Sequence, residues 1–204
     1  RYLGCRGGAD ERTRAMIEQC LTELERVVTP HTVTQEVSLS IDGDRLQIGS
    51  LAVTSHGLAH HLRGCTGAVL MAVTLGPGAD RLLHQKECTD MSVAVVMQAC
   101  AAAMVEAVCE DIQRSEQSAA ARGLYIRPRF SPGYGDWPLT DQQPLLDSLE
   151  AGKRIGLTVT DSLMLAPTKS VTAVIGLSHQ KGLCHVHKCA TCAKTDCAFR
   201  QIEA

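Results

Sequence analysis

Aromatic side chains are scarce in this chain. Phe, Trp and Tyr make up 3% of its 204 residues, although 45% of the residues are hydrophobic. The core must therefore be mainly aliphatic, and the length allows one domain or one domain with a small appendix. An excess of charge of one sign is also lacking, since the formal net charge is −2. We expect neither a nucleic-acid partner, which needs a basic surface, nor a disordered acidic chain.

Only one stretch is apolar over a length comparable to a membrane span. Residues 91–109, MSVAVVMQACAAAMVEAVC, contain a single charge, at Glu106, and are rich in Ala rather than Leu. Because Ala lets neighbouring elements approach closely, we predict a buried central helix and no membrane association. The chain also opens without a signal-peptide pattern, so we expect a cytoplasmic protein.

Cysteine, in contrast, is abundant, with ten residues. Four of them fall within fourteen residues near the end of the chain, and the other six are scattered, mostly among apolar residues. This distribution suits buried free thiols in a reducing compartment better than a disulfide framework. The six scattered cysteines are Cys5, Cys20, Cys65, Cys88, Cys100 and Cys109.

Hydrophobic periodicity predicts a single α+β domain over residues 1–180, with a mainly antiparallel sheet around the central helix, followed by a cysteine-rich tail over residues 181–204. Capping residues and Gly or Pro breaks set the predicted limits of each element. The predicted helices are 10–29 with Asp10 as N-cap, 55–62 with Ser55 as N-cap, one opening at the glycine-rich turn 75–80, 91–114, and 140–152 ended by Gly152; the predicted strands are 32–41, a short hairpin strand 45–51, 67–76, 154–167 and 169–179.

The stretch IRPRFSPGYGDWPL, residues 126–139, combines features of a small-molecule site. Its two inner prolines restrict the backbone, whereas Gly133 and Gly135 allow a ligand to approach the main chain. Arg129 offers a planar donor pair that fits a carboxylate, and Tyr134 offers a flat face and a hydroxyl. The residues favour an amino-acid-like or nucleoside-like ligand, and a rigid structural turn is the alternative.

This stretch resembles the Arg-x-x-x-Gly-Tyr motif of the activation domain of cobalamin-dependent methionine synthase. VEAVCE (105–110) is similar to the helix that gives an acidic ligand contact in that family, and the segment 155–179 resembles the paired strands that close the domain. The resemblance covers roughly residues 65–180 and is greatest to short, stand-alone members of the family. Here the motif continues Gly-Tyr-Gly, where the large enzymes usually have Gly-Tyr-Pro.

The resemblance implies a surface groove for S-adenosylmethionine. In that groove Arg129 would hold the methionine carboxylate, and the main chain around Ser131 and Gly133 would meet the polar edges of the nucleoside. Tyr134 would pack beside the position of methyl transfer, and Glu106 would hold the ammonium or sulfonium group. The protein would supply positioning more than acid–base chemistry.

The function implied is reductive reactivation of a cobalamin-dependent methyltransferase, with methionine synthase as the expected partner. The cobalamin would be carried by the partner's cobalamin-binding domain, and flavodoxin or ferredoxin could supply the electron. Two alternatives stay open: a metal- or cluster-binding interaction module that regulates a corrinoid methyltransferase, and an activator of another corrinoid protein such as an O-demethylase component.

The tail CHVHKCATCAKTDCAFR, residues 184–200, has the spacing of a metal or cluster site. Cys184, Cys189, Cys192 and Cys197 follow the pattern C-x4-C-x2-C-x4-C, and two adjacent histidines could replace the first cysteine. Four thiolates this close together can surround one zinc ion or one four-iron cluster. Zinc would fold the tail, whereas a cluster could pass the electron that cobalamin reactivation needs.

Two weaker features have ordinary structural explanations. His56 and His60 are four residues apart on a predicted helix and could chelate a metal, although a solvated helix surface is the simpler interpretation. LGPGAD, residues 75–80, lacks the lysine and the spacing of a phosphate loop, and we predict a tight strand-to-helix turn.

Overall fold

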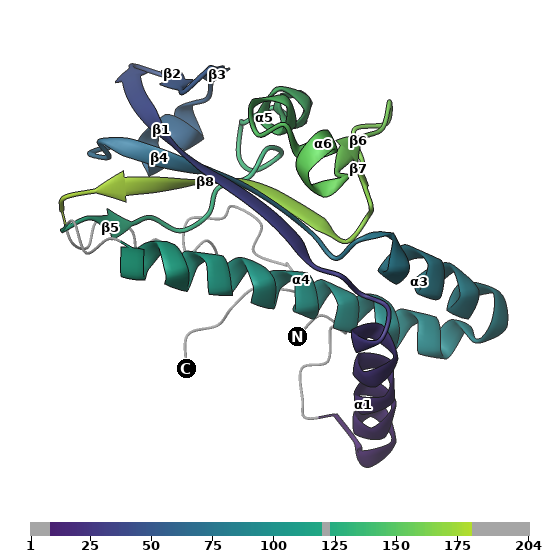
Figure 1. Cartoon of the computed structure of the whole chain (residues 1–204). Helices are drawn as coiled ribbons and strands as arrows, with labels where there is room; N and C mark the ends of the chain where they lie inside the picture. Colours follow the sequence, from purple (N-terminus) through teal and green to yellow (C-terminus); the bar gives the residue numbers. More distant parts are fainter. Residues whose placement is uncertain (1–8, 120–122, 181–204) are drawn as a thin grey trace.

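The computed structural model describes residues 9–119 and 123–180 (Figure 1). A six-stranded sheet with the order β3-β2-β1-β4-β8-β5 forms its centre, and every neighbouring pair in that sheet is antiparallel. This confirms the predicted α+β domain with a mainly antiparallel sheet. Its strands are β1 (His31–Asp42), β2 (Arg45–Ile48), β3 (Leu51–Thr54), β4 (Gly67–Thr74), β5 (Tyr125–Ile126) and β8 (Ser170–Ser178).

Helices cover both faces of the sheet (Figure 1). One face packs against α2 (His56–His61), α5 (Gln142–Ser148) and α6 (Ala151–Ile155), and the other against α1 (Glu11–Glu25), α3 (Pro77–Thr89) and α4 (Met91–Ala119). We call these the α2 face and the α4 face. Strand β4 contributes to both cores, because successive side chains point to opposite faces. Ala68, Leu70 and Ala72 join the α2-face core, and Val69, Met71 and Val73 join the α4-face core.

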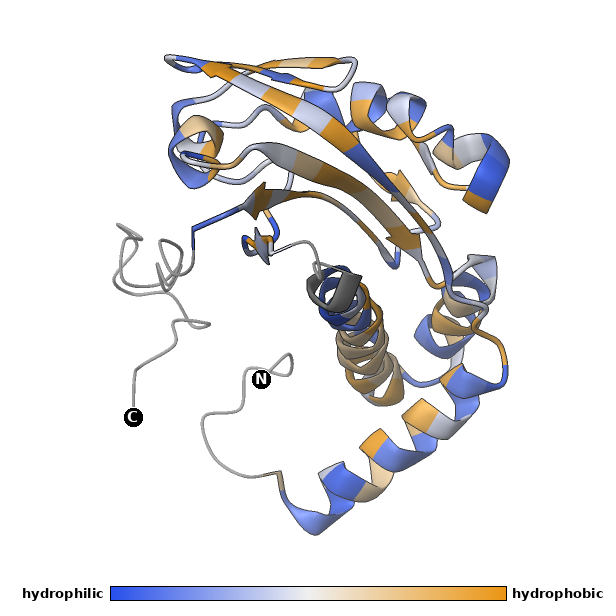
Figure 2. Ribbon diagram, turned by 60° about the vertical axis from the view of Figure 1, so that its left-hand side comes forward, coloured by the Kyte–Doolittle hydropathy of each residue, from blue (hydrophilic) through white to orange (hydrophobic). Residues whose placement is uncertain are grey.

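The central helix α4 is buried along one side only. By length and hydropathy alone it could cross a membrane, but it packs against the sheet, α1 and α3. Met91 and Val95 on its other side are 63% and 56% exposed. Figure 2 shows the apolar colouring of α4 beneath the sheet and the alternation of polar and apolar residues along α1. The prediction of a buried central helix is therefore confirmed for the side that faces the sheet.

The predicted helix starts are confirmed by their caps. The Asp10 carboxylate accepts a hydrogen bond from the Thr13 amide at 2.8 Å, and the Ser55 hydroxyl accepts one from the Leu58 amide at 3.0 Å. These bonds satisfy amide donors that have no partner within the first helical turn. The turn after β4 is the predicted strand-to-helix turn, with Gly76 at a φ of 80°.

The predicted helix 140–152 is wrong in its extent. The chain forms a 3-10 turn (Leu139–Asp141), then α5, and then a separate helix α6. The break lies at Glu150, which has a left-handed φ of 50°. Gly152 lies inside α6, and Gly156, with a φ of 66°, ends it. The break places buried Leu149 and Ala151 in the α2-face core, which periodicity within one helix does not reveal.

The predicted strand 154–167 is also wrong. This segment ends α6 and then forms a separate two-stranded sheet of β6 (Thr158–Val159) and β7 (Leu165–Ala166). The turn between them is closed by a hydrogen bond from the Thr160 amide to the Met164 carbonyl at 2.9 Å. The predicted strand 45–51 divides in the same way at Gly49, with a φ of 59°, into β2 and β3. Short turns thus interrupt apolar runs that look continuous.

The contact between the segment that follows α1 and the start of α3 predicts a severe effect of one methyl group. A Cβ added at Gly78, in the first turn of α3, would lie 2.0 Å from the carbonyl oxygen of Val27. Because that atom belongs to the backbone, Gly78→Ala should lower the free energy of unfolding by about 3 kcal/mol. Urea unfolding followed by tryptophan fluorescence would measure the change.

Gly152→Ala is the matched control for this substitution. Its added Cβ would have no neighbour closer than 3.8 Å, and Ala favours a helix over Gly by about 0.8 kcal/mol. We therefore expect the control to be as stable as the wild type or slightly more so. Equal stability of the Gly78 and Gly152 variants would contradict the close contact between Gly78 and Val27.

Candidate functional site

A one-residue bulge opposite β8 begins the candidate site. The Arg127 amide donates a hydrogen bond to the Gly176 carbonyl at 2.8 Å, as regular antiparallel pairing requires. Further along, Phe130 and Val174 exchange both of their backbone hydrogen bonds, at 3.0 and 2.8 Å. The chain therefore advances three residues from Arg127 to Phe130, while the partner strand β8 advances only two, from Gly176 to Val174. The extra residue is a β-bulge, a feature that redirects side chains.

The bulge determines which face each side chain takes. Arg127 and Phe130 both lie on the α2 face, where Arg127 approaches Gly176 and Phe130 packs against the core. Between them, Arg129 turns to the opposite face and contacts α4. Strict alternation would have placed Arg127 and Arg129 on the same face. The bulge thus separates these two arginines and directs Arg129 to the helix that carries Glu106.

Arg129 and Glu106, both predicted site residues, form an ion pair. Nη2 of Arg129 lies 2.8 Å from Oε2 of Glu106, and its Nε donates to the Gln113 side-chain oxygen at 2.6 Å. The two side chains are 16% and 36% exposed, respectively. Glu106 and Gln113 are seven residues apart, so they project from the same side of α4. The guanidinium is therefore held in a fixed orientation at the edge of the site.

The electrostatics keep the arginine charged and the neighbouring thiol neutral. Burial alone lowers the pKa of Arg129, but Cys109, Glu106 and Tyr134 outweigh this effect and leave the pKa raised. Burial raises the pKa of Cys109 to about 11, although the Arg129 charge opposes the shift. At neutral pH the site therefore contains a guanidinium cation beside a protonated thiol.

We call residues 128–137 the candidate loop. Its tip is closed by its own backbone: the Tyr134 amide donates to the Ser131 carbonyl at 3.1 Å, and the Gly133 amide donates to the Trp137 carbonyl at 2.9 Å. The Gly133 N–H is thus already bonded, whereas the Ser131 carbonyl keeps a second lone pair for a ligand. Gly133 has a φ of 86°, and a Cβ there would lie 3.1 Å from the Leu139 side chain. Glycine is therefore required at this position.

Two aromatic side chains of the loop face different environments. Trp137 is 1% exposed, and its indole N–H donates to Asp141 at 2.8 Å. Tyr134 is 48% exposed, and its ring packs against the Phe130 ring in a T-shaped arrangement with the centroids 6.1 Å apart. The loop is therefore anchored by a buried indole and presents the tyrosine at the surface.

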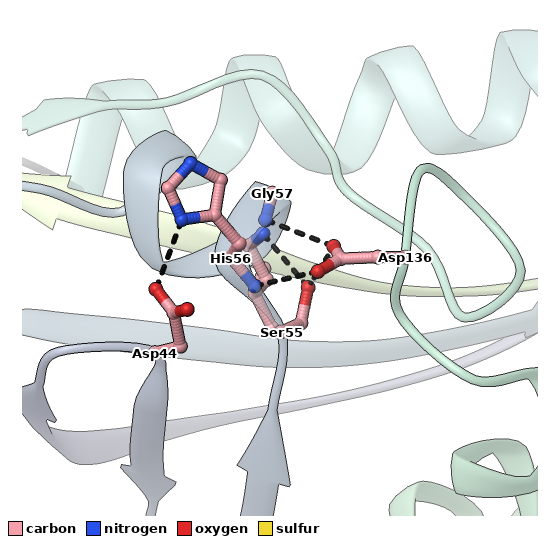
Figure 3. A network of polar contacts seen from close by, with 6 residues as sticks. Asp44, Ser55, His56, Gly57 and Asp136 are labelled. Atoms are coloured by element: carbon pink, nitrogen blue, oxygen red, sulfur yellow. Dashed lines mark hydrogen bonds and ion pairs between the residues drawn. The ribbon is translucent and has the colours of Figure 1, made fainter.

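Asp136 joins the loop to the start of α2 and was not among the predicted site residues. Figure 3 shows its carboxylate facing the backbone at the start of α2. It accepts hydrogen bonds from the Ser55 hydroxyl at 2.6 Å, the His56 amide at 2.7 Å and the Gly57 amide at 2.9 Å. The bond from Ser55, followed by that from Gly57, lowers the pKa of Asp136 to about 2. No sequence motif links residues 55–57 to a residue eighty positions later.

The histidine pair of α2 lines a hollow away from the candidate loop. Nδ1 of His56 lies 3.0 Å from Oδ1 of Asp44, and both residues, with His60, border a cavity of about 360 Å³ (Figure 3 shows the first two). Within residues 9–119 and 123–180, no three His, Cys, Asp or Glu side chains gather as a metal site.

The scattered cysteines fit the predicted thiols in part. Of those in the described part of the chain, Cys20, Cys100 and Cys109 are buried and free, Cys65 is half-buried, and Cys88 is exposed. Cys5 lies outside the described residues, as do the predicted ligands Cys184, Cys189, Cys192 and Cys197. The predicted division at residue 180 and the metal centre of the tail therefore stay predictions.

Comparison with solved structures establishes the class of fold. The chain matches the crystal structure of the MetH reactivation domain bound to AdoHcy with a TM-score of 0.64 and 19% sequence identity. The match covers 84% of this chain and 66% of that one, so the chain spans just under two thirds of that structure. At this identity the likeness concerns the fold, a reactivation-domain fold with its sheet and long central helix.

The family follows from the sequence match. The family model of the activation domain of vitamin B12-dependent methionine synthase matches residues 58–201, well over half of the chain. A search of curated proteins finds no match. The chain belongs to the vitamin B12-dependent methionine synthase activation domain family. The resemblance drawn from the Arg129–Tyr134 motif is confirmed.

The shifted carboxyl of Asp136 predicts a specific pH dependence. The pKa of Asp136, about 2, lies below the usual value of about 3.9. The charged carboxylate therefore stabilises the fold at any pH above the usual value, and this stabilisation is lost as the pH falls through 2. Asp136→Asn should therefore be less stable than the wild type at pH 7, and the difference should narrow as the pH falls from 5 towards 2. Urea midpoints across this range would measure it.

Asp147→Asn removes an exposed carboxylate on α5 that bonds only the nearby Gln143 in the described structure, and it serves as the control. Its stability should stay close to that of the wild type at every pH. A constant or widening difference for Asp136→Asn at acid pH would show that the Asp136 charge does not stabilise the native state.

Proposed function

We propose that the protein reactivates a cobalamin-dependent methyltransferase, with methionine synthase as the expected partner, by binding S-adenosylmethionine at the candidate loop. Membership of the activation domain family supports the reactivation role. The structural relative bound to AdoHcy, the product that S-adenosylmethionine leaves after methyl transfer, supports the choice of ligand. The observation that carries the proposal for this chain is the Arg129–Glu106 pair beside the exposed ring of Tyr134.

The charges of this pair match the amino-acid end of S-adenosylmethionine. The ligand carboxylate would take the position of the Glu106 carboxylate on Arg129, because a guanidinium binds carboxylates through paired donors. Glu106 would then hold the ligand ammonium or sulfonium group. Gln113 keeps the Arg129 guanidinium oriented, which lowers the entropy lost on binding. The Tyr134 face and the free lone pair of the Ser131 carbonyl would meet the nucleoside.

The reaction needs positioning more than acid–base groups. The methyl group would leave the sulfonium sulfur and bond to the reduced cobalt of the partner's cobalamin, with S-adenosylhomocysteine as the product. One electron from flavodoxin or ferredoxin would first reduce the inactive cobalt(II). Holding the donor in line with the acceptor accelerates such a transfer without any proton movement. The exposed position of Tyr134 places the proposed transfer site where a docked partner could reach it.

Removing Arg129 tests the ligand site. Arg129→Ala should weaken the binding of S-adenosylhomocysteine and S-adenosylmethionine by about 10- to 100-fold, because a charge-assisted hydrogen bond to the ligand is lost. Glu106→Gln should weaken both by about tenfold through loss of the ammonium contact. Calorimetric titration of anaerobically purified protein would measure the affinities, and circular dichroism would confirm folding.

Arg154→Ala and Glu150→Gln are the matched controls, because each changes an exposed residue of the same type at α6, on the opposite face of the sheet from the Arg129–Glu106 pair. Both should bind as the wild type does. Unchanged binding in Arg129→Ala would remove the proposed site. If the wild-type protein does not bind the ligand at millimolar concentration, the result favours the alternative hypothesis that the protein is an interaction module that regulates a corrinoid methyltransferase.

We further propose that the tail cysteines hold a metal centre, either zinc or a four-iron cluster. The proposal depends on the spacing of Cys184, Cys189, Cys192 and Cys197 alone. Iron, sulfide and zinc assays on anaerobically purified protein should find about four iron and four sulfide, or one zinc, per chain. The double variant Cys189→Ser/Cys192→Ser should lose the metal, and Cys88→Ser should keep it. Metal-free wild-type protein would overturn this proposal.

A further inference from the structure

Helix α2 contacts the candidate loop at both ends of the loop. At the start of α2, the Asp136 carboxylate accepts three hydrogen bonds, from Ser55, His56 and Gly57 (Figure 3). At the end of α2, Nε2 of His61 lies 2.7 Å from the Pro128 carbonyl oxygen. The Arg129–Tyr134 segment lies between these two points of attachment.

We infer that Asp136 and His61 are positioning residues: through them α2 braces the candidate loop and so sets the relative places of Arg129 and Tyr134. The inference rests on the function proposed above, because it concerns the geometry of the proposed S-adenosylmethionine site. Neither residue needs to touch the ligand. The brace connects the loop to the α2-face core, whereas Arg129 itself is held from the α4 face.

The contact at Asp136 is specific for a carboxylate. All three partners donate hydrogen bonds, and a carboxylate is the side chain that only accepts. An amide at this position would turn its own N–H2 group towards one of these donors. Space is also limited, since a Cβ added at Gly57 would lie 2.8 Å from Oδ1 of Asp136. A substitution at Asp136 or at Gly57 should therefore disrupt the same contact.

The contact at His61 acts on the bulge. A carbonyl oxygen only accepts hydrogen bonds, so Nε2 of His61 must carry a hydrogen and donate it to Pro128. The same ring packs on Phe130, with the centroids 5.1 Å apart. His61 thus holds residues on both sides of Arg129, and this helps to fix the backbone that directs the guanidinium towards α4.

The helix is itself firmly anchored. Leu58 and the C-cap residue Leu62 are 0% exposed, and Ser55 is 2% exposed. Because buried side chains have few alternative positions in a close-packed core, α2 offers a fixed reference for the loop. An error in the loop position of about 1 Å is enough to weaken catalysis strongly in enzymes that work by orientation.

The single tryptophan of the chain reports on the brace directly. Trp137 follows Asp136 and is 1% exposed, so acrylamide should quench it weakly in the wild type. In Asp136→Asn and in Gly57→Ala, we expect the quenching constant to rise about twofold or more as the loop loosens. Asp147→Asn, the control, should match the wild type. All proteins are compared well below their unfolding midpoints, so that global unfolding does not contribute.

Ligand affinity gives the second readout. Asp136→Asn and Gly57→Ala should each weaken S-adenosylhomocysteine binding by about tenfold, and the double variant should be no weaker than the worse single variant, because both changes break one contact. His61→Ala should weaken binding to a similar extent, and its effect should persist in the Asp136→Asn background because the two contacts are separate. Asp147→Asn should bind as the wild type does.

Two results would overturn the inference. One is Trp137 quenching that stays at the wild-type level in both Asp136→Asn and Gly57→Ala. The other is wild-type affinity for S-adenosylhomocysteine in these variants despite a loosened loop. A wild-type protein that fails to bind this ligand would instead count against the proposed function, and the quenching series would still decide whether α2 braces the loop.

Discussion

The pairing of β5 and the candidate loop with β8 determines how the site is built. In a regular antiparallel pair, Arg127 and Arg129 would share a face of the sheet. The extra residue between Arg127 and Phe130 breaks this alternation, so that Phe130 packs under α2 and Arg129 meets Glu106 on α4. The ion pair between Arg129 and Glu106 follows from this one change of register.

Gly176 of β8 leaves room for close packing beside the bulge. A Cβ at this position would lie within 3.0 Å of Cys65, Leu62 and the Arg127 side chain at once. The absence of a side chain lets α2 and Arg127 approach the sheet together. Arg127 is 3% exposed, and its Nη2 lies 3.5 Å from the Arg63 carbonyl near the end of α2. The α2 face and the α4 face thus each receive one arginine of this segment, Arg127 on the first and Arg129 on the second.

Local signals in the sequence were sufficient for much of this fold. Asp10 and Ser55 marked helix starts because capping depends on residues three positions apart, and the apolar run 67–76 marked a strand because β4 is covered on both faces. The breaks at Glu150 and in the 160–164 turn were missed, since the first is a left-handed backbone conformation and the second is closed by backbone hydrogen bonds. A left-handed glutamate carries no local signature.

For the site, the residue types were predicted and their connections were not. The Arg-x-x-x-Gly-Tyr motif led to Arg129, Gly133 and Tyr134, and the helix resemblance led to Glu106. That Arg129 and Glu106 bond each other depends on the bulge, which requires the register of β8. Asp136 escaped notice because its three partners lie about eighty residues away.

The closed Arg129–Glu106 pair has a consequence for selectivity. A simple anion that bound Arg129 would leave the Glu106 carboxylate without its cation, and a simple cation on Glu106 would strand a guanidinium that is only 16% exposed. Either exchange leaves one charge uncompensated where solvent compensates it poorly. Only a molecule that carries both charges close together can replace the pair without this penalty. In the proposed site the pair would therefore disfavour the abundant small ions of a cell and favour zwitterions, before any contact with the rest of the ligand is made.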